Sequence, residues 1–142
     1  MTRVEFYFNV ADKLAKVTEL CDRAVTKSRQ LTIFAQDELM ANLLQLKLWQ
    51  YAPGSFLPSA HPLDENSRFA PIIVDVTGDH LIQDDILINL KAEHPPFFSR
   101  FRYLVELVGN DEADKAAARL RYKFYRDRGY QVKSTDAAAG NL

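Results

Sequence analysis

The stretch KAAARLRYKFYRDRGY, residues 115–130, combines many positive charges with several aromatic rings. Lysine and arginine bind anionic groups, and arginine can grip a carboxylate or a phosphate through two parallel hydrogen bonds. Aromatic rings beside them offer apolar surface to a bound molecule. The whole chain has a formal net charge of −1, so the positive charge is local. This local cluster of positive charge predicts an anion-binding surface near the end of the chain. The near-zero net charge indicates that the protein is not a general polyanion binder.

Helical spacing sorts these residues into faces. At about 100° per residue, one narrow stripe of a helix expected over residues 111–128 is formed by Lys115, Arg119, Tyr122 and Arg126. Val108 ends the preceding predicted strand and should lie near the start of this helix. The same spacing predicts that the core-facing side lies directly opposite the stripe and is formed by Ala113, Ala117, Leu120 and Phe124.

Three interpretations of the stripe remain open. Surface helices commonly carry Lys and Arg, which also favour the C-terminal end of the helix dipole. An exposed face, however, usually alternates in sign to form i,i+4 ion pairs, and this stripe contains no acidic residue. Basic walls with a Tyr or Val floor suit an acidic peptide with an apolar end. Arg and Tyr could instead contact single-stranded nucleic acid directly, although the near-zero net charge counts against it.

A second candidate surface is aromatic. Residues 50–69, QYAPGSFLPSAHPLDENSRF, contain Pro, Gly and polar residues and predict a long loop. Trp49 either completes the packing of the preceding helix or belongs to an interface, and Phe56 lies within the loop. Large aromatic residues are enriched at protein–protein interfaces, so these two residues indicate a docking surface for a second partner.

No catalytic constellation emerges from the remaining reactive residues. The three histidines are scattered and form no metal-ligand pattern, and Cys21 lies on the apolar side of a helix, where packing is its expected role. The first strand-to-helix turn, NVADK, lacks the glycines that a phosphate-binding loop needs. We therefore expect no cofactor, no metal and no enzymatic activity of its own.

These residues are positioned by alternating strands and helices. Strands are predicted at 4–10, 31–36, 71–76, 85–90 and 102–109, with a short final strand at 130–134. Helices are predicted after the first strand and over 37–49, where Leu39, Leu43 and Leu46 keep the helical period together with Met40 and Leu44. This order predicts a mainly parallel sheet flanked by helices with right-handed crossovers.

The chain length of 142 residues fits one α/β domain spanning residues 1–142, with a frayed tail over 135–142. The single cysteine excludes an internal disulfide and fits a reducing compartment. No segment reaches the roughly 18 apolar residues that span a bilayer, and no signal peptide is recognised at the start. The expectation is a cytoplasmic protein without membrane contact.

Several segments in order resemble the chi subunit family of the bacterial DNA polymerase III holoenzyme. They are FYF in the first strand, LW followed by SFLPS, DILINL and, most specifically, RYKFYRDRGY. The resemblance implies a three-layer Rossmann-like domain without a nucleotide-binding loop, and an accessory subunit of the clamp-loader complex without catalysis. It also implies a heterodimer with the psi subunit, binding to the acidic C-terminal tail of single-stranded DNA-binding protein, and only indirect contact with DNA.

The resemblance also assigns roles to residues of this chain. The tail-binding positions of the family correspond to Val108, Lys115, Arg119 and Tyr122, to which the stripe adds Arg126. Arg119 is the expected main carboxylate contact, and Val108 with Tyr122 would hold the terminal apolar residue. Trp49 and Phe56 correspond to the surface that meets psi. The linker between this loop and PIIVDV departs from the family pattern, which leaves the rim of the psi surface undefined.

Overall fold

The computed structural model describes residues 1–51, 59–64 and 70–138. These residues form a seven-stranded sheet of β1 (Arg3–Phe8), β2 (Leu31–Phe34), β3 (Ser59–Ala60), β4 (Ile72–Asp75), β5 (Ile86–Asn89), β6 (Tyr103–Leu107) and β7 (Val132–Asp136). The helices are α1 (Lys13–Thr26), α2 (Glu38–Trp49) and α3 (Glu112–Asp127), with a short 3-10 turn at Phe98–Arg100. None of the helices in these ranges is long and apolar enough to cross a bilayer.

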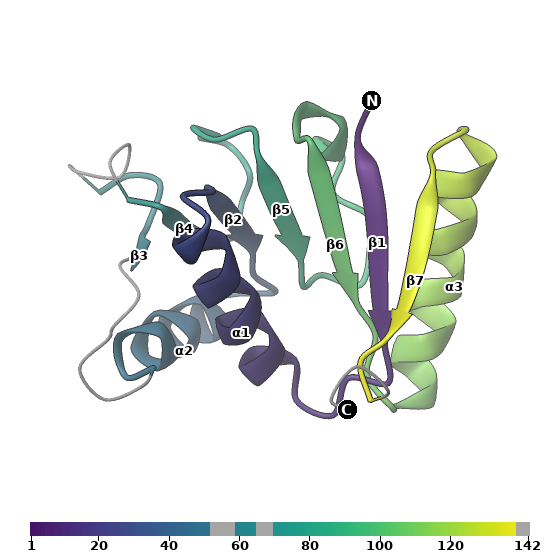
Figure 1. Cartoon of the computed structure of the whole chain (residues 1–142), viewed down its shortest axis with the longest axis horizontal. Coiled ribbons are helices and arrows are strands. Elements are labelled where there is room, and N and C mark those ends of the chain that lie inside the picture. The colour runs from purple at the N-terminus through teal and green to yellow at the C-terminus, as the bar shows by residue number, and fades with distance from the viewer. Residues whose placement is uncertain (52–58, 65–69, 139–142) are drawn as a thin grey trace.

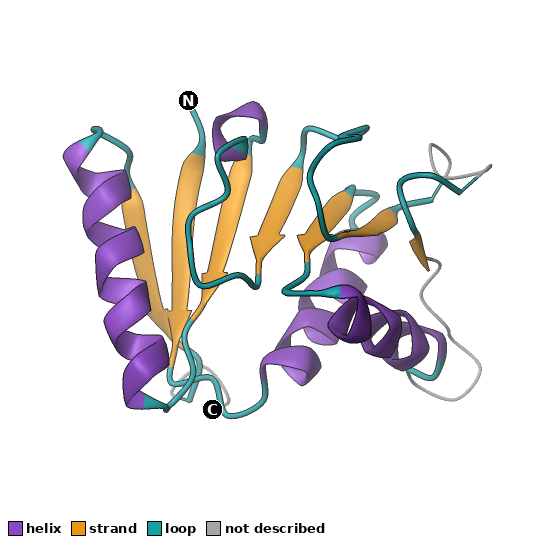
Figure 2. Cartoon of the chain, turned by 180° about the vertical axis from the view of Figure 1, so that it is seen from behind, coloured by secondary structure: helices purple, strands orange, loops and turns teal. Residues whose placement is uncertain are grey.

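The strand order across the sheet is β3-β4-β2-β5-β6-β1-β7, and every strand pair in the described residues is parallel. α1 joins β1 to β2 and α2 joins β2 to β3, and both connections run toward the β3 edge of the sheet. α3 joins β6 to β7 and runs past β1 in the opposite direction. Right-handed crossovers therefore place α1 and α2 on one face and α3 on the other, as Figures 1 and 2 show from opposite sides. The predicted three-layer α/β architecture is confirmed.

Each face of the sheet has its own apolar core. The face under α1 and α2 packs residues from both helices against alternate strand residues, among them Val17, Cys21, Leu44, Leu48, Ile33 and Ile88. The face under α3 packs Val4, Phe6, Leu104, Phe98, Ala118 and Tyr125. Cys21 is fully buried, and burial raises the pKa of its thiol to about 12. Its role is packing, as expected.

Two strands differ from the sequence-based expectation. The final strand extends to Asp136, so residues 135 and 136, placed in a frayed tail by sequence reasoning, pair with the end of β1. The Thr135 hydroxyl donates to Glu5 at 2.8 Å, and the Ala137 N–H donates to the Phe8 carbonyl at 2.9 Å. At the opposite edge, the short strand β3 lies within the predicted loop 50–69 and pairs with β4. In both cases hydrogen bonding to a neighbouring strand outweighs the local composition, which is weakly strand-forming.

Candidate binding surfaces

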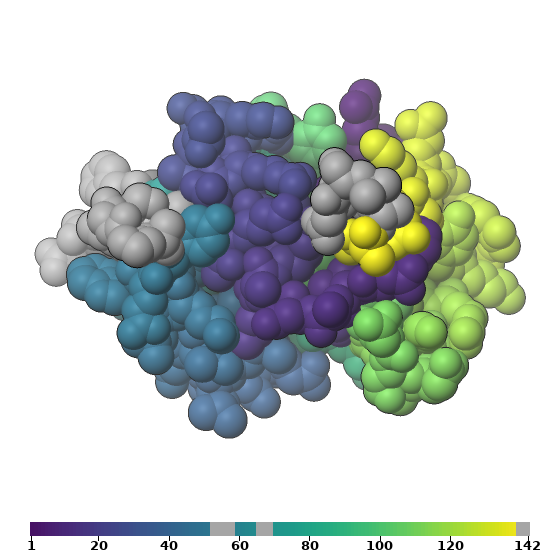
Figure 3. Space-filling model, turned by 60° about the horizontal axis from the view of Figure 1, so that its bottom comes forward, coloured from purple at the N-terminus to yellow at the C-terminus, as the bar shows by residue number. Residues whose placement is uncertain are grey.

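A groove of about 530 Å³ runs between α3 and the ends of β1 and β7. Figure 3 shows the start of α3 (green) beside the end of β1 (purple) and the described end of the chain (yellow). The groove is lined by all five residues that the sequence predicts for tail binding, which are Val108, Lys115, Arg119, Tyr122 and Arg126. Residues that sequence reasoning missed complete it: Phe6, Phe8, Asn9, Gly109, Ala118, Lys123 and Ser134.

The floor of the groove is apolar and anchored to the sheet. Val108 is 7% exposed, and its N–H donates to the Tyr7 carbonyl at 2.8 Å while its carbonyl accepts from Val10 at 3.0 Å. The Tyr122 ring packs against the Phe6 ring, with 5.4 Å between centroids. Ala118, 5% exposed, also lines the groove from α3, one helical turn before Tyr122. The floor is therefore held in place before any ligand arrives, which limits the entropy lost on binding.

The rim of the groove is positively charged. The Arg126 guanidinium lies 5.8 Å from the centre of the Tyr122 ring, a cation–π arrangement that keeps both side chains beside the floor. The Lys115 ammonium is 3.6 Å from a Glu112 carboxylate oxygen. Because Glu112 is 83% exposed, this ion pair is weak and leaves Lys115 able to contact an anion. Together with Arg119, these residues place cations around the apolar floor of the groove.

The buried side of α3 differs from the sequence-based prediction. Its buried residues are Ala118, Arg121 and Tyr125, whereas Leu120 is 73% exposed and Ala113 is exposed. Hydrophobic periodicity predicts Ala113, Ala117, Leu120 and Phe124 on the core side. It is wrong for Ala113 and Leu120, because it does not allow for a buried arginine, whereas Phe124 is half-buried and packs against the core. The observed core direction lies about 90° from the stripe rather than opposite it. The stripe therefore borders the sheet, and this position allows it to form one wall of a groove.

A buried charge cluster sets this rotation of α3. Glu106, fully buried on β6, accepts from Arg121 Nε at 3.0 Å and from the Tyr125 hydroxyl at 2.6 Å. The Asn89 amide donates to both Glu106 carboxylate oxygens, and Arg121 also donates to the Ala92 carbonyl at 2.7 Å. Burial raises the pKa of Glu106, while Arg121, Tyr125 and Asn89 act in the opposite direction. The hydrogen bonds tie two successive turns of α3 to the sheet.

The first turn of α3 is fixed by a second ion pair. Asp111 is the N-cap residue, but its side chain makes no capping hydrogen bond. Instead, Asp114 accepts from the Gly109 N–H at 2.6 Å and from Lys13 of α1 at 2.8 Å. Burial alone would raise the pKa of Asp114, but the contacts with Lys13 and Gly109 lower it overall. These contacts hold the β6–α3 turn, and with it Val108 and Lys115, at the mouth of the groove.

A second candidate surface is an apolar ridge on α2. Leu39, Leu43, Leu46 and Trp49 recur at helical spacing and are 79%, 42%, 51% and 64% exposed. The residues of α2 that are buried are Ala41, Leu44 and Leu48. The residues that keep the helical period in the sequence therefore fall on two sides of the helix. Leu44 is buried and Met40 is half-buried, whereas the three leucines Leu39, Leu43 and Leu46 are exposed. A helix that is apolar on all sides is normally buried. The leucines on every side of α2 are therefore the sequence signal that could have revealed an apolar outer face. Phe56 lies outside the described residues.

The edge at which doubly wound sheets bind nucleotides is filled by side chains. β2 and β5 are neighbouring strands whose onward connections run in opposite directions across the sheet. Ligands of doubly wound folds bind beyond the carboxyl ends of the strands at such a point. Here Phe34, the last residue of β2, packs against Phe97 at 4.9 Å between centroids, with the Lys91 ammonium 4.5 Å from its ring. Gly78 leaves room for Phe97, since a Cβ there would come within 2.4 Å of its ring.

Fold and surfaces together define a three-layer α/β protein that carries a basic, aromatic groove and a separate apolar ridge. A family model described as DNA polymerase III chi subunit, HolC, matches residues 1–133. The chain is 34% identical to the DNA polymerase III subunit chi of Pseudomonas aeruginosa over 140 residues, covering 94% of this chain and 95% of the relative. It is 29% identical to the subunit chi of Escherichia coli over 143 residues, covering 94% and 97%. The chain belongs to the DNA polymerase III chi subunit family.

Proposed function

We propose that this protein is a non-catalytic accessory subunit of the bacterial DNA polymerase III clamp-loader complex. In this role it binds the acidic C-terminal tail of single-stranded DNA-binding protein and pairs with a psi subunit, linking the replication machinery to coated single-stranded DNA. One observation supports the tail-binding part above the others: five residues named from the sequence line a single groove with an apolar floor and a basic rim. Family membership supports the replication role.

The chemistry of the groove suits a peptide that ends in an apolar residue. The terminal side chain would lie on Val108 and Tyr122, where apolar floor is already in place. Arg119 would pair with the terminal carboxylate or an acidic side chain, and Lys115 and Arg126 would attract the acidic residues before it. A small site of this kind binds weakly, and several tails on one partner would raise the effective affinity.

Arg119→Ala should weaken binding of such a peptide about tenfold, because it removes a charge-assisted hydrogen bond of roughly 1.5 kcal/mol. The measurement is the fluorescence anisotropy of a labelled acidic peptide with an apolar C-terminal residue, titrated with the protein. Removing the apolar residue should weaken binding to a similar extent. Binding should also weaken with added salt, because screening acts over about 10 Å at 0.1 M ionic strength.

Arg100→Ala provides the matched control. Arg100 is exposed and lies in the turn before β6, at the opposite end of the strand from the groove, so its loss should leave peptide binding unchanged. Labelled single-stranded DNA is titrated in parallel. If the peptide does not bind while the DNA binds and loses affinity in Arg119→Ala, the stripe is a phosphate-binding surface and the tail-binding proposal is wrong.

The proposed psi contact is placed on the α2 ridge. The argument is that three leucines and a tryptophan, all on one exposed helix face, form an apolar surface of the kind that protein partners cover. The ridge belongs to a different helix, on the opposite face of the sheet from α3. Both partners could therefore bind at the same time, as a bridging subunit requires.

Leu46→Glu should abolish the heterodimer with a psi subunit without unfolding the protein, because it places a charge in the centre of the ridge. Size-exclusion chromatography with light scattering on the mixed proteins measures the complex. Leu120→Glu makes the same substitution at an exposed leucine of α3 and should leave the complex intact. A stable heterodimer with Leu46→Glu would show that psi binds elsewhere.

A further inference from the structure

Among the described residues, no helix covers the α1 side of strands β6, β1 and β7. On the α1 side, α1 and α2 cover strands β4, β2 and β5, while the front of β6, β1 and β7 lies open (Figure 1). Parallel sheets almost always have both faces covered, so an open half is unusual for this architecture. The other side of the same three strands is covered by α3 and by the phenylalanines of the turn before β6. The open face is therefore a surface that needs a separate explanation.

The open face is hollowed into a trough. One hollow of about 220 Å³ lies between α1 and strands β5, β6 and β1, and another of about 490 Å³ continues across β1 to β7. The two hollows share Glu5, Tyr103 and Val105 in their lining. Strands lie about 4.8 Å apart and packed helices about 8–10 Å apart. Three strands beside α1 therefore leave space for one additional helix.

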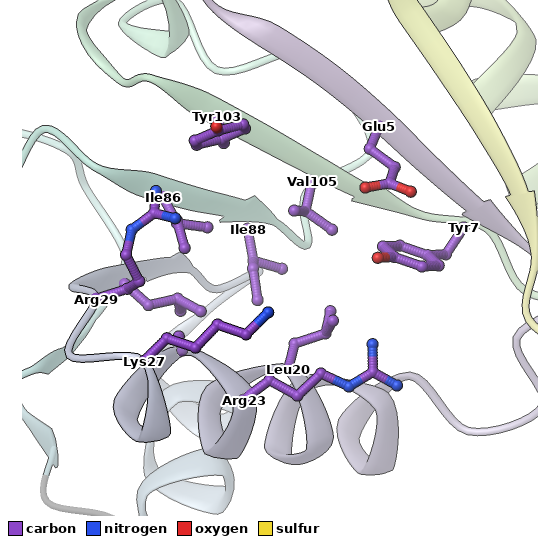
Figure 4. Close-up of a pocket in the computed structure, with 12 residues that line it drawn as sticks. Glu5, Tyr7, Leu20, Arg23, Lys27, Arg29, Ile86, Ile88, Tyr103 and Val105 are labelled. Atoms are coloured by element: carbon purple, nitrogen blue, oxygen red, sulfur yellow. The ribbon is translucent and has the colours of Figure 1, made fainter.

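The part of the trough floor beside α1 is largely apolar, whereas the part over β1 and β7 carries Glu5 and Lys133. Figure 4 shows Ile88 and Val105 pointing from the sheet toward Leu20 of α1, with Ile86 and Tyr103 further along. The strand register places Ile86 beside Tyr103 and Ile88 beside Val105. Ile86, Tyr103 and Val105 are each only partly buried. An apolar ridge laid along these residues would remove them from water, at roughly 25 cal/mol per Å² of apolar area.

The walls of the trough are positively charged. Arg23 and Lys27 extend from α1 along one side, and both are exposed (Figure 4). Lys133 of β7 stands on the other side, and Arg3 and Arg29 line the end nearer the start of the strands. Arg23 pairs with Glu19 at 2.7 Å and Arg29 pairs with Asp85, so these two cations are partly neutralised within the chain. The cations of the walls still outnumber these carboxylates and Glu5. The remaining positive charge favours a partner with acidic residues flanking an apolar face.

Glu5 places a carboxylate in the floor, and its polar contacts are with residues of the neighbouring strand β7. Glu5 accepts from the Thr135 hydroxyl at 2.8 Å and lies 4.0 Å from the Lys133 ammonium. Burial and the nearby Glu5 charge raise the pKa of the Tyr7 hydroxyl, while Arg23 acts in the opposite direction. Glu5 therefore sits within a local network and does not reverse the positive sign of the walls. Glu5 also places a negative charge where the phosphates of a nucleic acid lying across the floor would pass, and this disfavours nucleic acid as the ligand.

We propose that this trough is the docking site of an amphipathic helix from a partner protein, with an apolar ridge flanked by Asp and Glu residues. The helix would lie beside α1 and complete the outer layer of the sheet. Single-stranded nucleic acid fits the trough less well, since cations already occupy positions over the two tyrosine rings that could stack on bases. The Arg29 guanidinium lies 5.0 Å from the Tyr103 ring and the Lys16 ammonium 4.9 Å from the Tyr7 ring.

The probe is a synthetic 15-residue helical peptide with leucines at i, i+4, i+7 and i+11 and glutamates on both flanks. It is titrated into the full chain with 13C-labelled Ile, Leu and Val methyl groups, and NMR shifts report where it binds. We expect shifts at Ile86, Ile88, Val105 and Leu20. The double variant Arg23→Glu/Lys27→Glu should weaken binding about tenfold or more, as two reversed surface charges predict. Arg119→Ala, in the other groove, should leave binding unchanged.

Each other outcome contradicts the proposal. Shifts confined to Leu43 and Leu46 would assign the peptide to the α2 ridge, and shifts confined to Val108 would assign it to the α3 groove. Equal binding of a peptide with lysines in place of the glutamates would exclude the charge complementarity argued here. An absence of shifts at millimolar peptide would show that the trough does not bind helices. The proposal does not depend on tail binding, because the expected shifts and the Arg23→Glu/Lys27→Glu variant lie on the face of the sheet opposite α3.

Discussion

Arg121→Leu is expected to lower the free energy of unfolding by about 3–5 kcal/mol, the usual cost of removing one partner of a buried ion pair. The substitution leaves the Glu106 carboxylate without its cation at a fully buried position. The Tyr125 hydroxyl and the Asn89 amide would still donate to Glu106, but neither supplies a charge. The carboxyl group must then be buried unpaired or take up a proton, and both options cost free energy relative to the native pair.

Urea denaturation followed by circular dichroism measures this effect. Arg119→Leu is the matched control, because it makes the same substitution two residues earlier on the same helix, at an exposed position. Its effect on the free energy of unfolding should stay within about 0.5 kcal/mol. Adding Glu106→Leu to Arg121→Leu should recover part of the lost stability, since a fully apolar replacement removes the unpaired charge. Equal costs for Arg121→Leu and Arg119→Leu would contradict the role given to the cluster.

The same cluster shows why sequence reasoning found residues that line one groove yet misplaced the core side of α3. Charge and aromatic type are properties of single residues, so the stripe of Lys115, Arg119, Tyr122 and Arg126 can be read directly from helical spacing. The rotation of the helix about its axis depends on Glu106, which is distant in the sequence and lies on another element. Nothing in the local pattern distinguishes the buried Arg121 from the exposed Arg119.

The parallel α/β layout could be predicted because alternating strands and helices permit few topologies. The order of the strands could not, since β6 lies between β5 and β1 only through long-range pairing. The sheet-side lining of the groove was missed for the same reason. Phe6 and Phe8 belong to the first strand, and they reach α3 only because β1 is placed between β6 and β7. A single sequence carries no local pattern that shows which distant segments pair with each other, so these contacts could not be predicted.

On α2, the difficulty was an excess of hydrophobic residues. Two apolar faces overlap in residues 37–49, so a single helical period fits several sets of leucines equally well. The structure separates them: Leu44 and Leu48 face the core, while Leu43 and Leu46 belong to the ridge. For a helix of this kind, burial decides which leucines stabilise the fold and which are available to a partner.

Leu44→Ala is expected to lower the free energy of unfolding by about 2–5 kcal/mol, because it removes buried methyl groups and leaves a cavity. Leu44 is fully buried between α2 and the sheet. Leu46→Ala is the matched control, with the same substitution two residues later on the ridge, where 51% of the residue is exposed. Its effect should be within about 0.5 kcal/mol. Urea midpoints of the two variants give the comparison directly.

The pair also separates stability from binding on one helix. Leu46→Ala keeps the fold and shortens the ridge, so any loss of psi binding in this variant reports the interface alone. Leu44→Ala keeps the ridge but weakens the layer beneath it, and it should affect psi binding only through the fraction of unfolded protein. If Leu46 proved as costly to truncate as Leu44, the outer face of α2 would be part of the core, and the proposed site for a second partner would have to move.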